Sequence, residues 1–169
     1  MTNKPKQFDI KQALIESAQS YFQLLDCEIV LQSQDFIEQS SYMLKFFKTN
    51  FLHLTGLKTS LSTEDFFLRC YAGTILESDY TLGPTNDRNT VKRKLKNLIH
   101  INDFFKSKIM VQETFVKNKV VCKIATSDEK YTIGFVDAKY YLRPQTILAN
   151  NHLDKSRPIY IVSPIINKQ

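Results

Sequence analysis

The chain has 169 residues, ordinary apolar and charged fractions, and a net charge of +6 with an isoelectric point near 9.2. This length suits one domain, residues 1–169, whose core needs neither disulfides nor a structural metal, and the few prolines and glycines exclude a low-complexity chain. The basic charge favours an anionic partner such as nucleic acid, but many basic proteins bind no such partner.

The first third of the chain predicts an arm, a helix and two strands. Residues 1–8 are polar and are expected to form a flexible arm. Asp9 precedes an apolar pattern at helical spacing and is predicted to cap a helix over residues 10–26. Alternating side chains predict strands over residues 27–32 and 42–48.

The stretch 50–56, Asn-Phe-Leu-His-Leu-Thr-Gly, is the most suggestive part of the sequence. If residues 51–55 are extended, His53 and Thr55 project on the same side, because side chains two apart in a strand share a face. An imidazole beside a hydroxyl, on a backbone anchored by buried leucines, is a plausible part of an active site. The competing interpretation is a core histidine with one polar partner, which short motifs do not separate from a catalytic residue.

Two further helices are expected after this stretch. Ser62 is predicted to cap the first, with Asp65 at its N3 position, and a loop follows over residues 83–87. The second helix is predicted over residues 88–105 and carries an apolar stripe.

The helix over residues 88–105 also carries four basic side chains, Lys92, Arg93, Lys94 and Lys96. At 100° per residue, Lys92 and Lys94 flank the apolar stripe on opposite sides, Lys96 lies further round, and Arg93 points away. Basic side chains beside a stripe can lay their stems on the core and extend their charges toward a cleft. We therefore predict that these four residues bind nucleic acid, with a solvated basic face as the alternative.

The last third of the chain is rich in strands. Three antiparallel strands are predicted over residues 108–117, 119–126 and 131–137, and a final strand over 157–163. Between them, residues 140–148 begin extended, because the residue before proline avoids the helical region. The order of elements predicts an α+β fold in which helices pack on a twisted antiparallel sheet of about four to six strands.

Several classes of function are excluded by missing motifs. The sequence has no P-loop, dinucleotide fingerprint, HExxH motif, nucleophile elbow or EF-hand loop. Acidic residues are scattered, so a two-metal site would lack its ligands, and neither a metal nor a cofactor is expected. Cys27, Cys70 and Cys122 form no CxxC or Cys/His cluster, which favours reduced thiols in the cytoplasm. We find neither a secretion signal nor an apolar run near the ~18 residues of a membrane span, so no membrane partner is expected.

Metal-free cleavage of RNA is a reaction that the available residue types support. The ribose 2′-hydroxyl attacks the adjacent phosphate, the 5′-oxygen leaves with a proton, and cations stabilise the charge. DNA lacks the 2′-hydroxyl, so this chemistry predicts RNA as substrate. In addition to the lysines of the basic helix, the candidate catalytic residues are His53, Thr55, Tyr141, Arg143, Thr146 and Ser163.

Two stretches resemble motifs of the phage-associated branch of the barnase–EndoU–colicin–RelE-like nuclease superfamily. One is Phe-Leu-His-Leu-Thr-Gly-Leu at residues 51–57. The other pairs Gly-Phe-Val at 134–136 with Tyr-Tyr-Leu-Arg-Pro-Gln-Thr-Ile-Leu at 140–148. The resemblance extends over residues 28–168. It implies a barnase/RelE-like fold of helices and an antiparallel sheet, and a metal-independent ribonuclease of phage or mobile-element origin. Our first hypothesis is therefore a small cytoplasmic ribonuclease that acts as a toxin or defence effector, with a cognate antitoxin or immunity protein as its partner.

The resemblance carries over to particular residues. His53 and Thr55 match the first motif, and Tyr141, Pro144 and Thr146 match the second. Arg143 and Ser163 are added on chemical grounds alone. The chain departs from the family pattern at residues 117–122, where small residues and a glycine are more usual.

Two alternatives stay open. The same fold could serve as a non-catalytic RNA- or protein-binding module, such as a phage inhibitor of a host defence complex. A purely structural mobile-element protein is the third possibility. Persistence of RNA cleavage with a chelator, and its loss on changing His53, would separate the first interpretation from the others. The oligomeric state is left undetermined.

Overall fold

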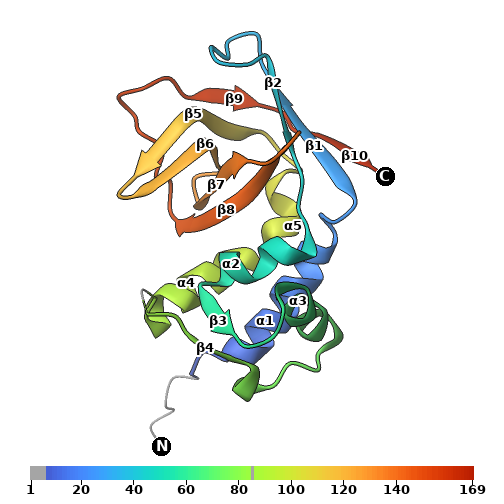
Figure 1. Cartoon of the computed structure of the whole chain (residues 1–169). Helices are drawn as coiled ribbons and strands as arrows, with labels where there is room; N and C mark the ends of the chain where they lie inside the picture. The colour runs from blue at the N-terminus through green and yellow to red at the C-terminus, as the bar shows by residue number, and fades with distance from the viewer. Residues whose placement is uncertain (1–6, 85) are drawn as a thin grey trace, which may run out of the picture.

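The computed structural model describes residues 7–84 and 86–169, and it has a layer of helices beneath a curled sheet (Figure 1). Its helices are α1 (Ile10–Phe22), α2 (Phe51–Thr55), α3 (Thr63–Ala72), α4 (Arg88–Leu98) and α5 (Ile101–Phe104), with 3-10 turns η1 (Lys48–Asn50) and η2 (Glu77–Asp79). Its strands are β1 (Cys27–Gln32), β2 (Ser41–Leu44), β3 (Leu57–Thr59), β4 (Tyr80–Leu82), β5 (Ile109–Lys117), β6 (Val120–Ser127), β7 (Tyr131–Asp137), β8 (Leu142–Ala149), β9 (Tyr160–Val162) and β10 (Ile165–Lys168). The predicted α+β class is confirmed.

The sheet is larger than the sequence indicated. Over the described residues it has eight strands in the order β10-β1-β2-β8-β7-β6-β5-β9, so the prediction of about four to six strands was wrong. It is also mixed, because β2 and β8 pair in parallel through Leu44 and Leu142. Only Ser163 and Pro164 separate β9, which pairs with β5, from β10, which pairs with β1. The sheet therefore curls until its two ends meet along one run of chain.

Two predicted helix caps are confirmed. The Asp9 carboxylate accepts a hydrogen bond of 3.1 Å from the Gln12 amide at the start of α1. The Ser62 hydroxyl accepts one of 3.1 Å from the Asp65 amide at the start of α3. Of the predicted arm, residues 1–6 lie outside the described part of the chain, whereas the Phe8 ring packs against the core.

Several predicted elements differ from the structure. The helix expected over 10–26 ends at Phe22, and the strand expected over 157–163 is limited to Tyr160–Val162. The strand expected over residues 42–48 ends at Leu44, and the helix expected over 88–105 divides into α4 and α5. Residues 51–55 form helix α2 instead of an extended segment. Short apolar runs fit either period, and the deciding residue is Gly56, whose left-handed backbone (φ 76°) ends the single helical turn. The small β3–β4 hairpin was not predicted.

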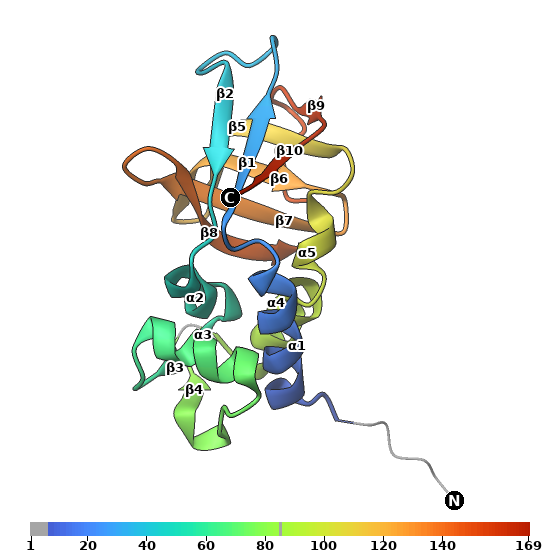
Figure 2. The same cartoon turned by 90° about the vertical axis from the view of Figure 1, so that its right-hand side faces the viewer.

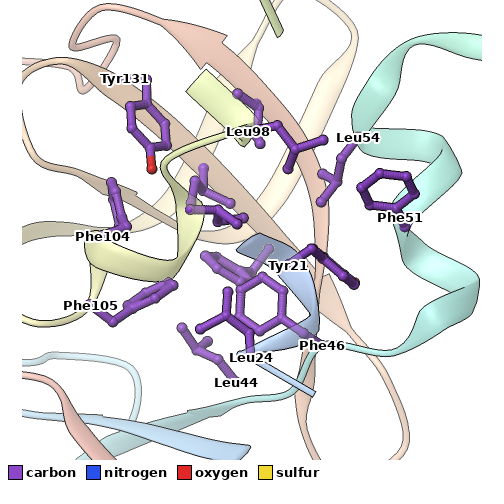
Figure 3. Packing of buried hydrophobic residues seen from close by; sticks show 14 of the residues in the cluster. Tyr21, Leu24, Leu44, Phe46, Phe51, Leu54, Leu98, Phe104, Phe105 and Tyr131 are labelled. Carbon is purple, nitrogen blue, oxygen red and sulfur yellow. The ribbon is translucent and has the colours of Figure 1, made fainter. Parts of the chain in front are cut away.

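The core lies between the sheet and the helices and holds α2 in place (Figure 3). The Tyr21 ring of α1 contacts the rings of Phe46 and Phe51, with centroids 5.7 and 5.3 Å away. Its hydroxyl donates a 2.7 Å hydrogen bond to the Phe47 carbonyl. Because both sides of the turn into α2 are anchored on one buried side chain, α2 is fixed between β8 and the β3–β4 hairpin (Figures 1 and 2).

Candidate active site

The site forms along an edge of β8 that pairs with no strand in the described part of the chain. On one side β8 pairs with β7 from Leu142 to Ala149, but on the other it meets β2 only at Leu142. Helices α2 and α4 lie against this edge. The Lys94 ammonium of α4 donates a 2.9 Å hydrogen bond to the Ile147 carbonyl, which satisfies part of the exposed backbone.

A bulge in β8 aims one side chain at α2. Gly134 of β7 faces Thr146 and the next residue, Phe135, faces Pro144, so Gln145 is an extra, unpaired residue. Proline donates no hydrogen bond to a ladder and is typical of bulges and edges. The bulge turns Gln145 toward the helix, and such re-aiming of a side chain is common beside active sites.

Helix α2 ends in a way that lets α4 approach closely. Gly56 closes the turn, and its carbonyl accepts a 3.0 Å hydrogen bond from the Asn86 side chain. A Cβ atom at Gly56 would lie only 3.1 Å from Lys94 Cδ. The absence of a side chain at this position therefore leaves room for the lysine stem beside α2.

Three side chains form a hydrogen-bonded row along the edge. Arg143 Nη1 donates to Gln145 Oε1 at 3.0 Å, and Gln145 Nε2 lies 3.1 Å from His53 Nε2. A guanidinium only donates, so it fixes the amide with its oxygen toward Arg143 and its NH₂ group toward His53. The imidazole Nε2 must then accept, which assigns a neutral His53 with its proton on Nδ1.

The charges around His53 favour the same protonation state. Partial burial of its ring lowers the pKa of His53 below the ordinary 6.5, and the positive charges of Lys94 and Arg143 lower it further. Burial also lowers the pKa of Lys94. His53 nevertheless stays exposed to solvent, so a ligand has access to it. This arrangement can accept a proton next to two cations, as general-base catalysis at an anionic substrate requires.

The structure brings together only part of the predicted set. His53, Arg143 and Lys94 gather at the β8 edge. Tyr141 lies in the bend before β8, with its ring centroid 5.2 Å from that of Phe47. Thr55 does not share a face with His53, because α2 is helical. Its hydroxyl is fully buried, donates to the Leu52 carbonyl and accepts from the Leu57 amide.

The structure does not bring the remaining predicted residues into this row. Thr146 points toward β7, since its methyl would be 3.1 Å from a Cβ at Gly134. Ser163 is exposed on the link between β9 and β10. On α4, Lys92 Nζ lies 5.8 Å from the centre of the Phe8 ring, whereas Arg93 and Lys96 are exposed. The predicted directions of these α4 side chains are confirmed.

Sequence reasoning missed Gln145, which connects Arg143 to His53. The sequence carried one weak signal for this role, Pro144 inside a strand. A proline at such a position indicates a bulge or a sheet edge. The described residues contain no group of three or more His, Cys, Asp or Glu side chains that could hold a metal ion. Within the same residues, no helix has the length and apolar character needed to cross a membrane.

Comparison with known proteins gives one match. A family model described as phage-Barnase-EndoU-ColicinE5/D-RelE like nuclease4 matches residues 13–169, which is nearly the whole chain. Searches of curated proteins and of solved structures gave no significant match. The resemblance noted from the sequence is thereby confirmed at the level of the superfamily branch.

Proposed function

The chain belongs to the phage-associated barnase–EndoU–colicin–RelE-like nuclease family just described, and from this membership we propose that it is a metal-independent endoribonuclease. The observation that supports this best is the row Arg143–Gln145–His53 beside Lys94, which presents a neutral imidazole among cations. A barnase/RelE-like fold, a toxin or defence-effector role, and a cognate antitoxin or immunity protein belong to the same proposal.

His53 is the general base in this proposal. Its Nε2 is unprotonated and accepts a single hydrogen bond, from Gln145 Nε2. The ribose 2′-hydroxyl takes the place of that amide, gives its proton to Nε2, and its oxygen attacks the adjacent phosphorus. The new P–O2′ bond forms as the P–O5′ bond breaks, which yields a 2′,3′-cyclic phosphate and a 5′-hydroxyl. DNA cannot react in this way.

Arg143 and Lys94 stabilise the negative charge that develops on the phosphate. Both lie along the same strand edge as His53, Arg143 through its hydrogen bond to Gln145 and Lys94 through its hydrogen bond to the Ile147 carbonyl. The Lys94 ammonium uses one of its three donors on the Ile147 carbonyl, which leaves donors for a phosphate oxygen. The exposed charges of Arg93 and Lys96, and that of Lys92, attract the rest of the RNA backbone.

Tyr141 gives a proton to the leaving 5′-oxygen. It lies in the bend just before β8, two positions before Arg143, and the intervening Leu142 is buried in the core. In this proposal its phenol reaches the leaving oxygen from the side of Phe47, whose ring centroid lies 5.2 Å from its own. The predictions for Thr55, Thr146 and Ser163 stay predictions, and this mechanism does not need them.

The test is cleavage of labelled single-stranded RNA by purified protein in the presence of EDTA. The wild type is expected to cleave, with a cyclic phosphate at the new 3′ end. His53→Gln is expected to lose roughly 10²–10⁴ of the rate, the usual contribution of a general base. RNA with one 2′-deoxy substitution at the mapped cleavage position should stay intact there.

His100→Gln is the matched control, because His100 is an exposed histidine at the start of α5. Equal losses in both variants, or full activity of His53→Gln, would rule out the assigned base. RNA that is bound but stays intact with the wild type would favour the alternative, a non-catalytic binding module.

A further inference from the structure

The turn between β7 and β8 holds a large aromatic side chain out in solvent. Asp137 pairs with Leu142, and the Ala138 amide donates a 2.8 Å hydrogen bond to the Tyr141 carbonyl. Lys139 and Tyr140 alone are left to form the turn. Tyr140 has 79% of its surface exposed. A short hydrogen-bonded hairpin thus presents this ring in a fixed place, although nothing in the fold requires it there.

A hollow adjoins this turn. Because β2 and β8 pair only through Leu44 and Leu142, the earlier part of β2 and the β7–β8 turn are not joined by hydrogen bonds. The hollow has a volume of about 260 Å³ and is lined by residues 137–142 together with Gln39, Tyr42 and Met43. This volume is below the usual range for drug-sized ligands and suits a ligand of one or two rings.

Cations lie over the aromatic rings at this place. Lys139 Nζ lies 5.6 Å from the centre of the Tyr140 ring, and Lys45 Nζ lies 5.9 Å from that of Tyr141. Lys45 is also paired with Glu28 at 3.2 Å, and Asp137 is the one carboxylate in the lining. Exposed aromatic rings flanked by lysines are typical of proteins that bind single-stranded nucleic acid, where bases stack and phosphates pair.

We propose that this hollow binds one base of single-stranded RNA, from a nucleotide neighbouring the cleaved phosphodiester. The base stacks on Tyr140, and Lys139 contacts its phosphate. The position follows from the chain itself, because Tyr141 directly connects Tyr140 to the strand that carries Arg143. This inference rests on the proposed function and adds to it a base-binding subsite.

The first test compares Tyr140→Ala and Tyr140→Phe with the wild type. The probe is a short, fluorescein-labelled, mixed-sequence single-stranded RNA with 2′-O-methyl groups, which cannot be cleaved, and its Kd is measured by fluorescence anisotropy. Tyr140→Ala is expected to weaken binding about tenfold, while Tyr140→Phe, which keeps the ring, binds as the wild type does. Tyr71→Ala, which removes a partly exposed ring from α3, is the matched control and leaves Kd unchanged.

The second test removes the base instead of the tyrosine. An RNA that is abasic at the nucleotide beside the mapped cleavage position should bind the wild type more weakly. It should lose little further affinity with Tyr140→Ala, because both changes remove the same stacked pair. Independent losses would overturn the stacking assignment.

The outcomes separate this inference from the function on which it rests. If the wild type cleaves RNA and Tyr140→Ala binds as tightly as the wild type, the subsite is wrong and the ribonuclease stands. If the wild type neither cleaves nor binds any RNA, both are wrong. If the wild type forms a complex with another protein, and Tyr140→Ala abolishes that complex but leaves RNA binding unchanged, the hollow is a protein-binding site instead.

Discussion

Two polar centres of this protein, one around Glu113 and one around His53, differ in the burial and the hydrogen bonding of their titratable side chain. The Glu113 carboxylate of β5 is 6% exposed and accepts hydrogen bonds of 2.7 and 2.9 Å from the amides of Ile37 and Glu38, and another from the Tyr42 hydroxyl. His53 is exposed to solvent and its ring is bonded only to Gln145 in the described structure.

The two centres also hold their titratable side chains in different charge states. Burial would raise the pKa of Glu113, but the hydrogen bonds from Tyr42 and the backbone outweigh it and lower the pKa. The carboxylate is thus kept ionised and its acceptors are occupied, which ties the loop after β1 to β5. His53 is kept neutral and accessible. A closed centre stabilises the fold, whereas an open one keeps capacity for a ligand.

The largest expected effect is on the open centre. Arg143→Met should lower kcat/KM for RNA by roughly 10²–10³, because a charge that stabilises the transition state is lost, while the melting temperature stays close to that of the wild type. Arg143→Lys should recover little of the lost kcat/KM, since the ammonium lacks the planar fork that holds Gln145. Steady-state kinetics of RNA cleavage measure kcat/KM, and thermal unfolding measures the melting temperature.

Arg93→Met is the control for Arg143, because it removes an exposed guanidinium from α4. It should weaken cleavage far less and mainly at low salt. Similar losses in the two variants would mean that Arg143 acts only through diffuse charge, and the contrast between the centres would fail.

The closed centre should respond in stability instead. Glu113→Gln is expected to lower the free energy of unfolding by about 2 kcal/mol, because hydrogen bonds to a charged acceptor are weakened. Urea unfolding measures it, with Glu64→Gln on the exposed first turn of α3 as control.

The pH dependence of this loss has a definite sign. The folded pKa of Glu113 is lowered from 4.5, so its contribution is complete above that value and is lost as pH falls through the folded pKa. The gap between wild type and Glu113→Gln should therefore close in acid. A gap that stays constant would contradict the assignment of an ionised carboxylate.

Replacing a glycine at a helix end should have a smaller effect, and the protein has two such glycines that can be compared. Gly56 and Gly73 both end helices with φ near 76°, but a Cβ at Gly73 meets nothing within 4 Å. Alanine at either position should cost about 1–2 kcal/mol of stability, the strain of a left-handed residue. Only Gly56→Ala should also slow cleavage, because it displaces Lys94. Equal cleavage rates in the two variants would remove Lys94 from the mechanism.

The smallest expected effect is a shift of the pH profile. Cleavage needs neutral His53, so its rate should fall in acid with a midpoint below 6.5, the ordinary pKa from which this residue is lowered. Gln145→Glu places a carboxylate beside the ring, favours the imidazolium and should move that midpoint to higher pH. An unmoved profile would show that Gln145 does not contact the catalytic base.

Local patterns in the sequence determined the α+β class, the caps at Asp9 and Ser62, and strands β5 to β7. Each depends on neighbouring residues, through a side chain that reaches a nearby amide or an alternation that the pleat imposes. The directions of the α4 side chains follow from helical geometry in the same way. The candidate roles of His53 and Arg143 also arose from residue type and resemblance.

Tertiary structure alone decided the helical turn at α2, the mixed eight-stranded sheet and the row through Gln145. A five-residue apolar run fits a helix or a strand, and only its packing on Tyr21 and its end at Gly56 settle which forms. The contact between Gln145 and His53 joins residues 92 positions apart across a bulge. No local pattern encodes such a distance, because it depends on how strands pair and where the sheet curls.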